Sequence, residues 1–382
     1  MKIIHISPSY KPAWCYGGPT RSVSLLCEAL TASGQQIEVL TTIANGNTEL
    51  KIATSDPISV DGVTIRYFKR ITKDHSHFSP ALLYYLYKNT SSKDCKAIIH
   101  IHSWWNMTSM LSCLIAKVNH KRVVLSPRGM LSSYTFSTGN SFLKKIVHKV
   151  IGKKLIDYCH IHATSNQEKK DILKLQQVRN SCTIPNLIQL PEKQTRSLRK
   201  TLKKMPFKIL FLSRIDKKKG LELLFRALAH LDFPWSLTLA GDGKYGYIKL
   251  LKSLSDSLFI SSSIAWLGEI SNTDKYPLIA SHDLLVLFSY NENFANVVLE
   301  SLSMGTPVAI SNRVGLADYV HLHQLGWISC LTVDSITSAL SDAYKNDMQR
   351  AIINSSAPLM IRNHFSATGL VQQYINFYHQ LA

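Results

Sequence analysis

Two carboxylates in the second half of the chain stand at a spacing that could serve a ligand site. Glu292 lies in a polar turn, and Glu300 follows with seven residues between them, inside an apolar pattern of helical period. The start of that helix offers unpaired N–H groups and a positive dipole end, which suit a phosphate. Because carboxylates are rarely buried alone, Glu300 needs a partner. An anion site flanked by carboxylates suits a ligand with both phosphates and hydroxyls, such as a sugar nucleotide.

The sequence around this pair is more specific than its spacing. After Glu300 it continues Ser-Leu-Ser-Met-Gly-Thr-Pro-Val, and the whole segment resembles the signature of the retaining glycosyltransferases of family 4. The alternative is a solvated turn residue at 292 and a paired structural carboxylate at 300. The resemblance implies an α/β fold of the GT-B class, with two Rossmann-like doubly wound domains facing a central cleft. It also implies transfer of a sugar from a nucleotide diphosphate to an acceptor hydroxyl with retained anomeric configuration.

A loop before the predicted helix at Leu221 carries four cations, Arg214, Lys217, Lys218 and Lys219. Cations have the wrong sign for the start of a helix. The loop is therefore either solvated or compensated by an anionic ligand, and such a local conflict is typical of binding sites. The resemblance implies that Arg214 and Lys219 hold the diphosphate of the donor.

The resemblance also implies that Glu292 holds a hydroxyl of the transferred sugar and that Glu300 accepts from the ribose. Most members have glycine where this chain has Ala295, so a methyl group there bears on which donor is bound. As catalytic residues we expect Glu292, His102, Arg214 and Lys219. As donor- and nucleotide-binding residues we expect Gly17, Gly18, Arg214, Lys219, Gly241, Asn293, Phe294, Ala295 and Glu300, and as acceptor or cleft residues Arg128 and Ser165.

Several of these residues lie where ligands bind in open α/β sheets, at the carboxyl ends of predicted strands. Gly17 and Gly18 join a loop to a helix, where glycine lets backbone N–H groups approach a phosphate, although an ordinary turn would look the same. His102 is either structural or, as the resemblance implies, in contact with the transferred sugar. Arg128 is either a cleft residue or part of an internal pair. Ser165 forms a capping box with the glutamate three residues later, which suffices to explain it.

The elements that position these residues alternate between strand and helix, as in doubly wound sheets. Buried strands are predicted at 2–7, 37–42, 63–68, 207–213, 236–240, 283–288 and 308–310, and helices at 21–33, 141–155, 221–230 and 370–381. The polar, basic stretch 191–204 predicts the interdomain connection. We expect an acceptor-binding domain at 1–190, a nucleotide-sugar-binding domain at 191–365, and a C-terminal helix, 366–382, that crosses back to the first domain.

The composition narrows the class of protein. A length of 382 residues favours two domains. Seven scattered cysteines without a C-x-x-C pair indicate neither a zinc site nor a disulfide framework, and they fit a reducing cytoplasm. The N-terminal apolar run is too short for a signal peptide, and no stretch approaches the ~20 apolar residues of a membrane span. The sequence has no D-x-D pair of the kind that holds Mg²⁺ or Mn²⁺ in metal-dependent transferases, so we expect no metal and no cofactor beyond the donor substrate.

The net charge of +19 admits nucleic acid, an anionic membrane surface or anionic small substrates as partners. The predicted helix at 141–155 has an apolar stripe and a lysine-rich side, so it either packs on the core or rests on an anionic bilayer. The sequence has no recognisable DNA-reading motif. We therefore expect a nucleotide-sugar donor, a saccharide or lipid-linked acceptor and no nucleic acid. We expect a cytoplasmic protein, with peripheral attachment to the inner face of the plasma membrane as an open alternative.

The resemblance implies a retaining glycosyltransferase of the hexosyltransferase type, and the absence of a D-x-D pair predicts that it is metal-independent. The resemblance to bacterial members places it in the synthesis of surface polysaccharide or lipid-linked oligosaccharide, such as O-antigen, capsule or exopolysaccharide. The alternatives are another GT-B enzyme, such as a sugar-nucleotide epimerase or a phosphorylase, and a basic nucleic-acid-binding protein.

Overall fold

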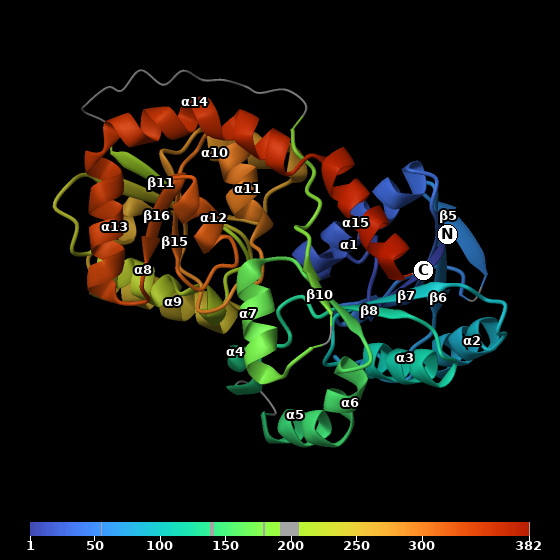
Figure 1. The fold of residues 1–382 in the computed structure, drawn as a ribbon. Coiled ribbons are helices and arrows are strands. Elements are labelled where there is room, and N and C mark those ends of the chain that lie inside the picture. Colours follow the sequence, from blue (N-terminus) through green and yellow to red (C-terminus); the bar gives the residue numbers. More distant parts are fainter. Residues whose placement is uncertain (55, 138–140, 179, 192–205, 382) are drawn as a thin grey trace. The chain divides into compact units, whose positions relative to one another are not determined.

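The computed structural model describes residues 1–54, 56–137, 141–178, 180–191 and 206–381, which form two compact units (Figure 1). Unit 1 comprises Met1–Ile188 and the C-terminal segment from Phe365, and unit 2 comprises Gln189–His364. The sequence predicts boundaries after residues 190 and 365, against 188 and 364 in the structure. Most of the predicted connection 191–204 lies outside the described residues.

Unit 1 is built on an eight-stranded sheet with the order β10-β9-β8-β7-β1-β2-β6-β5, parallel except for the edge pair β5 and β6. The strands are β1 (Lys2–Ser7), β2 (Gln36–Thr42), β5 (Pro57–Val60), β6 (Val63–Phe68), β7 (Ile98–His102), β8 (Val123–Ser126), β9 (His160–Ala163) and β10 (Ser181–Thr183). A small hairpin pairs β3 (Ala44–Asn45) with β4 (Thr48–Glu49). All five residues of β7 are buried, as expected for a parallel strand covered on both faces.

The helices of unit 1 are α1 (Gly18–Ala32), α2 (Pro80–Thr90), α3 (Met107–Val118), α4 (Ser133–Ser137), α5 (Ser141–Val147), α6 (Lys153–Ile156), α7 (Asn166–Leu175) and α15 (Ala367–Leu381), with a 3-10 turn η1 (Trp14–Tyr16). The helix predicted from residue 21 begins at Gly18, because Pro19 fits the first helical turn. The single helix predicted at 141–155 is wrong in detail, since a π turn, η2 (His148–Gly152), separates α5 from α6. Side chains of Ser79, Asn106 and Ser165 cap α2, α3 and α7.

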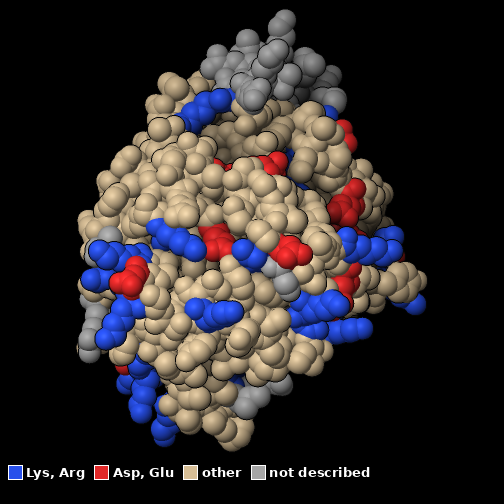
Figure 2. Space-filling model, turned by 90° about the vertical axis from the view of Figure 1, so that its right-hand side faces the viewer, with Lys and Arg blue, Asp and Glu red and all other residues tan. Residues whose placement is uncertain are grey.

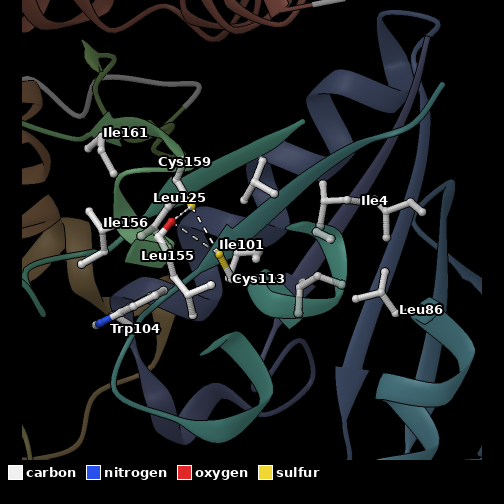
Figure 3. Close-up of a cluster of buried hydrophobic side chains, with 14 of the residues drawn as sticks. Ile4, Leu86, Ile101, Trp104, Cys113, Leu125, Leu155, Ile156, Cys159 and Ile161 are labelled. Atoms are coloured by element: carbon white, nitrogen blue, oxygen red, sulfur yellow. Dashed lines mark hydrogen bonds between the residues drawn. The ribbon is translucent and has the colours of Figure 1, made fainter. Parts of the chain in front are cut away.

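The core of unit 1 packs α3 and α6 against β7 and β8 (Figure 3). Cys113 of α3 and Cys159, just after α6, bring their sulfur atoms to 3.4 Å inside this core. Burial raises the pKa of the Cys159 thiol well above its ordinary value. All seven cysteines are free thiols, as their scattered spacing predicts.

Unit 2 is built on a six-stranded parallel sheet with the order β13-β12-β11-β14-β15-β16. Its strands are β11 (Phe207–Leu212), β12 (Trp235–Ala240), β13 (Ile264–Gly268), β14 (Leu284–Leu287), β15 (Val308–Ser311) and β16 (Gly326–Ser329). Its helices are α8 (Leu221–Leu228), α9 (Tyr245–Ser257), α10 (Asn272–Ala280), α11 (Asn296–Ser303), α12 (Ala317–Leu322), α13 (Val333–Lys345) and α14 (Asp347–His364), with 3-10 turns η3 (Lys217–Lys219) and η4 (Ser261–Ser263). The predicted alternation of strand and helix is confirmed here.

The C-terminal helix α15 belongs to unit 1, where it packs beside α1 (Figure 1). Its inner face is aromatic, with Tyr374, Phe377 and Tyr378 all buried. Among the described residues, no helix is both long and apolar enough to cross a membrane.

Candidate functional site

The strand order of unit 2 reverses between β11 and β14, since β12 follows on one side and β15 on the other. In open α/β sheets, ligands bind at the carboxyl ends of the strands at such a switch point. The loop 213–220 leaves β11 there and leads to α8, and the segment 288–295 leaves β14 and leads to α11. Predicted donor residues from two separate parts of the sequence therefore leave neighbouring strands.

Lys219 and Glu292 form an ion pair at this switch point. Lys219 Nζ donates to Glu292 Oε2 at 2.6 Å, and the two side chains are only 11% and 22% exposed. The Glu292 backbone is held by the loop after β15, because its N–H donates to the Arg313 carbonyl and its carbonyl accepts from the Gly315 N–H. Three loops thus fix one carboxylate beside one cation.

Two other cations of the loop after β11, Arg214 and Lys218, lie near the Lys219–Glu292 pair. Asp216 caps the turn η3 by accepting from the Lys218 N–H at 2.9 Å, so the cations precede α8 rather than forming its first turn. Burial lowers the pKa of the Lys218 ammonium below its ordinary value, and the Glu292 carboxylate opposes that shift. Arg214 is exposed, and its positive charge also lowers the pKa of Lys218. A bound anion would relieve this repulsion.

Two glycines let the strand ends and loops approach each other closely. Gly220 has φ 69°, and a Cβ there would lie 2.2 Å from the Phe288 carbonyl oxygen. A Cβ on Gly241 would lie 2.0 Å from the Ser213 carbonyl oxygen. Gly241 therefore has a structural reason to be glycine, and its expected contact with the nucleotide stays a prediction.

The segment that leads into α11 combines a buried ring with a strained residue. Phe294 is 3% exposed, so its ring packs in the core and leaves its backbone for the expected phosphate contact. Ala295 is the N-cap residue of α11 and has φ 67°, in the left-handed region. That region costs a residue with a Cβ about 1–2 kcal/mol. Ala295 is therefore strained, and Asn293, two residues before it, is partly buried.

Glu300, inside α11, is paired with the neighbouring helix α10. Lys275 Nζ donates to Glu300 Oε1 at 2.8 Å, and both side chains are mostly shielded from solvent. The prediction that this carboxylate needs a partner is confirmed. The sequence could not identify this partner, because Lys275 lies 25 residues away on a different helix.

In unit 1, His102 is buried in a histidine cluster. Arg128 Nε donates to His102 Nδ1 at 3.3 Å, and His102 Nε2 lies 2.9 Å from His5 Nδ1. A guanidinium can only donate, so a neutral His102 carries its proton on Nε2 and donates it to His5. Burial, and then the charges of His100 and Arg128, lower the pKa of His102 well below its ordinary value. Both ring nitrogens are used within unit 1, and the expected sugar contact stays a prediction.

A second chain of hydrogen bonds runs from α15 across β7, β8 and β9. His100 Nδ1 lies 2.6 Å from the Tyr378 hydroxyl, and His100 Nε2 lies 2.6 Å from Ser126 Oγ. Ser126 Oγ lies 2.6 Å from His162 Nδ1, and His162 Nε2 lies 2.9 Å from the Ile184 carbonyl oxygen. Burial lowers the pKa of His100 and of His162, so both rings are neutral. Because the carbonyl can only accept, His162 Nε2 carries that ring's proton, and each group of the chain donates toward the carbonyl. This chain ties α15 to the sheet.

The same cluster is a candidate metal-ligand set. One nitrogen each of His5, His100 and His102 lies within 4.8 Å of the others. Arg128 and the hydrogen bonds described above already engage His100 and His102, and a guanidinium beside the cluster repels a cation. The residues fit a hydrogen-bonded network better than a metal centre.

Arg128 and Ser165 have structural explanations within unit 1. Besides His102, Arg128 donates to Ser22 Oγ at 2.9 Å and to Asn186 Oδ1 at 3.0 Å, with φ 52°. These bonds favour the internal alternative for Arg128. Ser165 caps α7 by accepting from the Glu168 N–H at 3.1 Å. A role of either residue toward an acceptor stays a prediction.

Gly17 and Gly18 stand at the start of α1 with open space around them. Gly17 is the N-cap residue with φ 70°, a conformation that favours glycine. Gly18 is the first helical residue, and a Cβ on either glycine would meet no atom within 4 Å. The fold therefore gives no steric reason for glycine at position 18.

Gly18→Ala is expected to leave unit 1 folded and to lower kcat/KM of the predicted sugar transfer by about tenfold or more, because a methyl group would displace the diphosphate that the sequence resemblance implies at this backbone. Gly246→Ala is the matched control, since that glycine also lies in the first turn of a helix with nothing within 4 Å. Thermal melts and steady-state kinetics of both variants check this. Wild-type kcat/KM in a folded Gly18→Ala protein would remove Gly18 from the site.

Comparison with known proteins gives two family matches that lie end to end. Residues 16–191 match the family described as Glycosyltransferase Family 4, and residues 193–359 match Glycosyl transferases group 1. An uncharacterized glycosyltransferase of Methanocaldococcus jannaschii is 27% identical over 173 residues, 44% of either chain. D-inositol 3-phosphate glycosyltransferase of Mycobacterium tuberculosis is 32% identical over 110 residues, 28% of this chain and 23% of that protein. The aligned regions thus span less than half of these curated relatives.

Solved structures of low identity match the whole chain. Sucrose-phosphate synthase from Thermosynechococcus elongatus aligns with a TM-score of 0.76 at 18% identity, over 100% of this chain and 99% of that one. Anabaena Alr3699/HepE, in complex with UDP-glucose, aligns at 0.74 with 17% identity over all of both chains. WaaG, a glycosyltransferase involved in lipopolysaccharide biosynthesis, aligns at 0.68 with 14% identity over 98% and 99%. These matches confirm the predicted two-domain α/β fold of the GT-B class. The chain belongs to the glycosyltransferases of family 4.

Proposed function

We propose that this protein is a retaining glycosyltransferase that moves a sugar from a nucleotide-diphosphate sugar to an acceptor hydroxyl without a metal ion. The observation that carries the proposal is the Lys219–Glu292 pair, formed at 2.6 Å where β11 and β14 end and just before α11. It joins a cation suited to a diphosphate with a carboxylate suited to a sugar hydroxyl. Relatives of this chain are glycosyltransferases by name.

The chemistry requires stabilisation of the charge that grows on the departing diphosphate. Arg214 and Lys219 supply fixed positive charge, and the start of α11 supplies backbone dipoles. Fixed cations can do the work that a divalent ion does in other transferases, which supports the metal-free proposal. Glu292 would hold the transferred sugar, and Glu300 would accept from the ribose. The solved HepE complexes contain UDP and UDP-glucose, which makes UDP-sugars the first donors to test.

The acceptor proposed is a growing surface saccharide or a lipid-linked oligosaccharide. Two structural relatives, WaaG and WaaB, act in lipopolysaccharide synthesis according to their descriptions. On the face drawn in Figure 2, lysine and arginine side chains occur in separate groups with acidic side chains among them, not as one continuous stripe. That distribution suits small anionic substrates better than a nucleic-acid backbone.

A panel of UDP-, GDP- and ADP-sugars tests the proposal. We expect one nucleotide family to raise the Tm of the full chain and to be hydrolysed slowly without added metal and with chelator present. Random DNA, titrated under the same salt conditions, is the comparison for the nucleic-acid alternative. Stabilisation by DNA with no response to any nucleotide sugar would contradict the proposal. Inversion of a stereocentre in the sugar without any acceptor, in place of plain hydrolysis, would indicate an epimerase.

We further propose that the segment 142–154 binds the anionic inner face of the plasma membrane. Four of its apolar side chains are exposed, Phe142 at 77%, Ile146 at 43%, Val150 at 60% and Ile151 at 46%, so these four do not pack on the core. Lys145, Lys149, Lys153 and Lys154 are exposed beside them. The segment is anchored at its end by Leu155, which is 3% exposed in the core of unit 1. Exposed apolar side chains next to lysines match a bilayer surface that is apolar below and negative above.

Phe142→Ser combined with Val150→Ser is expected to lower the binding of the full chain to phosphatidylglycerol vesicles by about tenfold or more, because burying each apolar side chain contributes about 1.5–3 kcal/mol. Folding should not change, since both side chains face solvent. The matched control is Leu322→Ser with Leu359→Ser, which removes two apolar side chains that are 74% and 65% exposed in unit 2. Equal vesicle binding by the two double variants in a sedimentation assay would exclude this segment.

A further inference from the structure

The Glu300 carboxylate is held by a short chain of contacts that begins at the first residue of unit 2. The Gln189 carbonyl accepts a hydrogen bond from the Tyr276 hydroxyl and so fixes the ring. Lys275 Nζ lies 4.7 Å from the centroid of that ring, in cation–π contact. The same ammonium donates to Glu300 Oε1 at 2.8 Å. Lys275 therefore sits between a fixed ring and the carboxylate and is 14% exposed.

The pair leaves half of the carboxylate for another partner. Among the described residues, Lys275 is the one side chain that forms a hydrogen bond or ion pair with the Glu300 carboxylate, and it does so through Oε1. A carboxylate has about four acceptor positions, and Oε2 keeps its own. Glu300 is 16% exposed at its side chain, so solvent or a ligand reaches part of it. The contact with Lys275 therefore fixes the orientation of the Glu300 carboxylate before any ligand binds to Oε2.

Lys275 also removes an electrostatic conflict. Glu300 lies in the same helix whose start, at Asn296, is the proposed phosphate site. An uncompensated carboxylate within two turns of that site would repel a diphosphate. A lysine in contact with the carboxylate cancels this repulsion without removing the acceptor oxygen. Lys219 does the same for Glu292, at 2.6 Å.

We propose that Lys275 is a positioning residue for donor recognition, which holds Glu300 so that Oε2 accepts from the ribose hydroxyls of a nucleoside diphosphate. This proposal rests on the proposed function, because it assigns the ligand of Glu300 to the sugar-nucleotide donor. Lys275 acts through Glu300 and needs no contact with the reacting atoms. Its loss changes recognition of the ribose more than recognition of the phosphates.

Isothermal titration of the full chain with three probes tests the proposal. The probes are the nucleoside diphosphate that stabilises the wild type most among UDP, GDP and ADP, its 2′,3′-dideoxy form, and inorganic pyrophosphate. For Lys275→Met we expect about tenfold weaker binding of the nucleoside diphosphate and no remaining preference over the dideoxy form. Pyrophosphate binding should weaken less, by about two- to threefold, because the uncompensated Glu300 carboxylate repels it. Lys275→Arg should restore most of the preference, and Glu300→Gln should lose it. Lys252→Met, which removes an exposed lysine that contacts the Trp266 ring, should change none of the three.

The outcomes separate this inference from the proposed function. A wild type that binds none of the nucleoside diphosphates overturns both. A wild type that binds them, with Lys275→Met keeping the full preference over the dideoxy form, overturns the positioning role alone. Equal loss of all three probes in Lys275→Met and Lys275→Arg also overturns it, since that pattern reports a general disturbance of unit 2.

Discussion

Replacing Lys219 with alanine is expected to lower kcat of sugar transfer by about 10²–10³-fold, the usual cost of removing one fixed electrostatic donor from a developing negative charge. The structure adds a second contribution. Lys219 neutralises Glu292 at 2.6 Å, so its removal also exposes the diphosphate to an uncompensated carboxylate. Folding should change little, because the pair lies in the loops that follow the carboxyl ends of β11 and β14. Glu292 also keeps its backbone hydrogen bonds to Arg313 and Gly315.

The two contributions can be separated by a double variant. Glu292→Gln in the Lys219→Ala background removes the repelling charge, so the affinity for the nucleoside diphosphate should recover severalfold while kcat stays low. Lys249→Ala, an exposed lysine on α9, is the matched control and should behave as wild type. Single-turnover kinetics and nucleotide titrations measure the two effects. Wild-type turnover in Lys219→Ala would contradict the assignment of the site.

Acidification from pH 7.5 to 5.5 is expected to destabilise unit 1 by several kcal/mol. Burial lowers the pKa of His5 and of His162 to about 3 and lowers that of His100 and His102 well below the ordinary value. These rings are neutral in the folded state, while the unfolded chain binds protons below pH 6.5. Stability is therefore lost as the pH falls through 6.5 toward the folded-state pKa, at about 1.4 kcal/mol per ring and pH unit.

An effect of this size approaches the whole stability of a domain, about 5–15 kcal/mol. Burial is the main reason why the rings resist protonation. The hydrogen bonds act in the same direction, because His102 Nδ1 accepts from Arg128 and His100 Nδ1 accepts from Tyr378. Urea titrations at the two pH values, read out by hydrogen exchange of β1 and β7 amides, check the expectation. Equal urea midpoints for these amides would show that the cluster takes up no extra protons on unfolding.

The sequence by itself determined the local structure and the family. The local periodicity of apolar residues predicts the alternation of strands and helices. The strands predicted at 2–7, 37–42 and 63–68 therefore match the structure to within a residue. The segment that follows Glu292 indicated the glycosyltransferase family, and the two family matches confirm that prediction. The cations of the loop 214–219 were also visible, because their conflict with a following helix is a local feature.

Tertiary structure decided which partner each functional side chain has. Glu292 and Lys219 are 73 residues apart, and His5 and His102 are 97 apart, so no local pattern can pair them. The amphipathic pattern at 141–155 could not say what covers its apolar stripe. The structure leaves Ile146 and Val150 of that stripe exposed and breaks the helix with a π turn. Periodicity reports which face of an element is apolar. Only the packing of distant elements decides whether that face, or a charge beside it, meets protein or solvent.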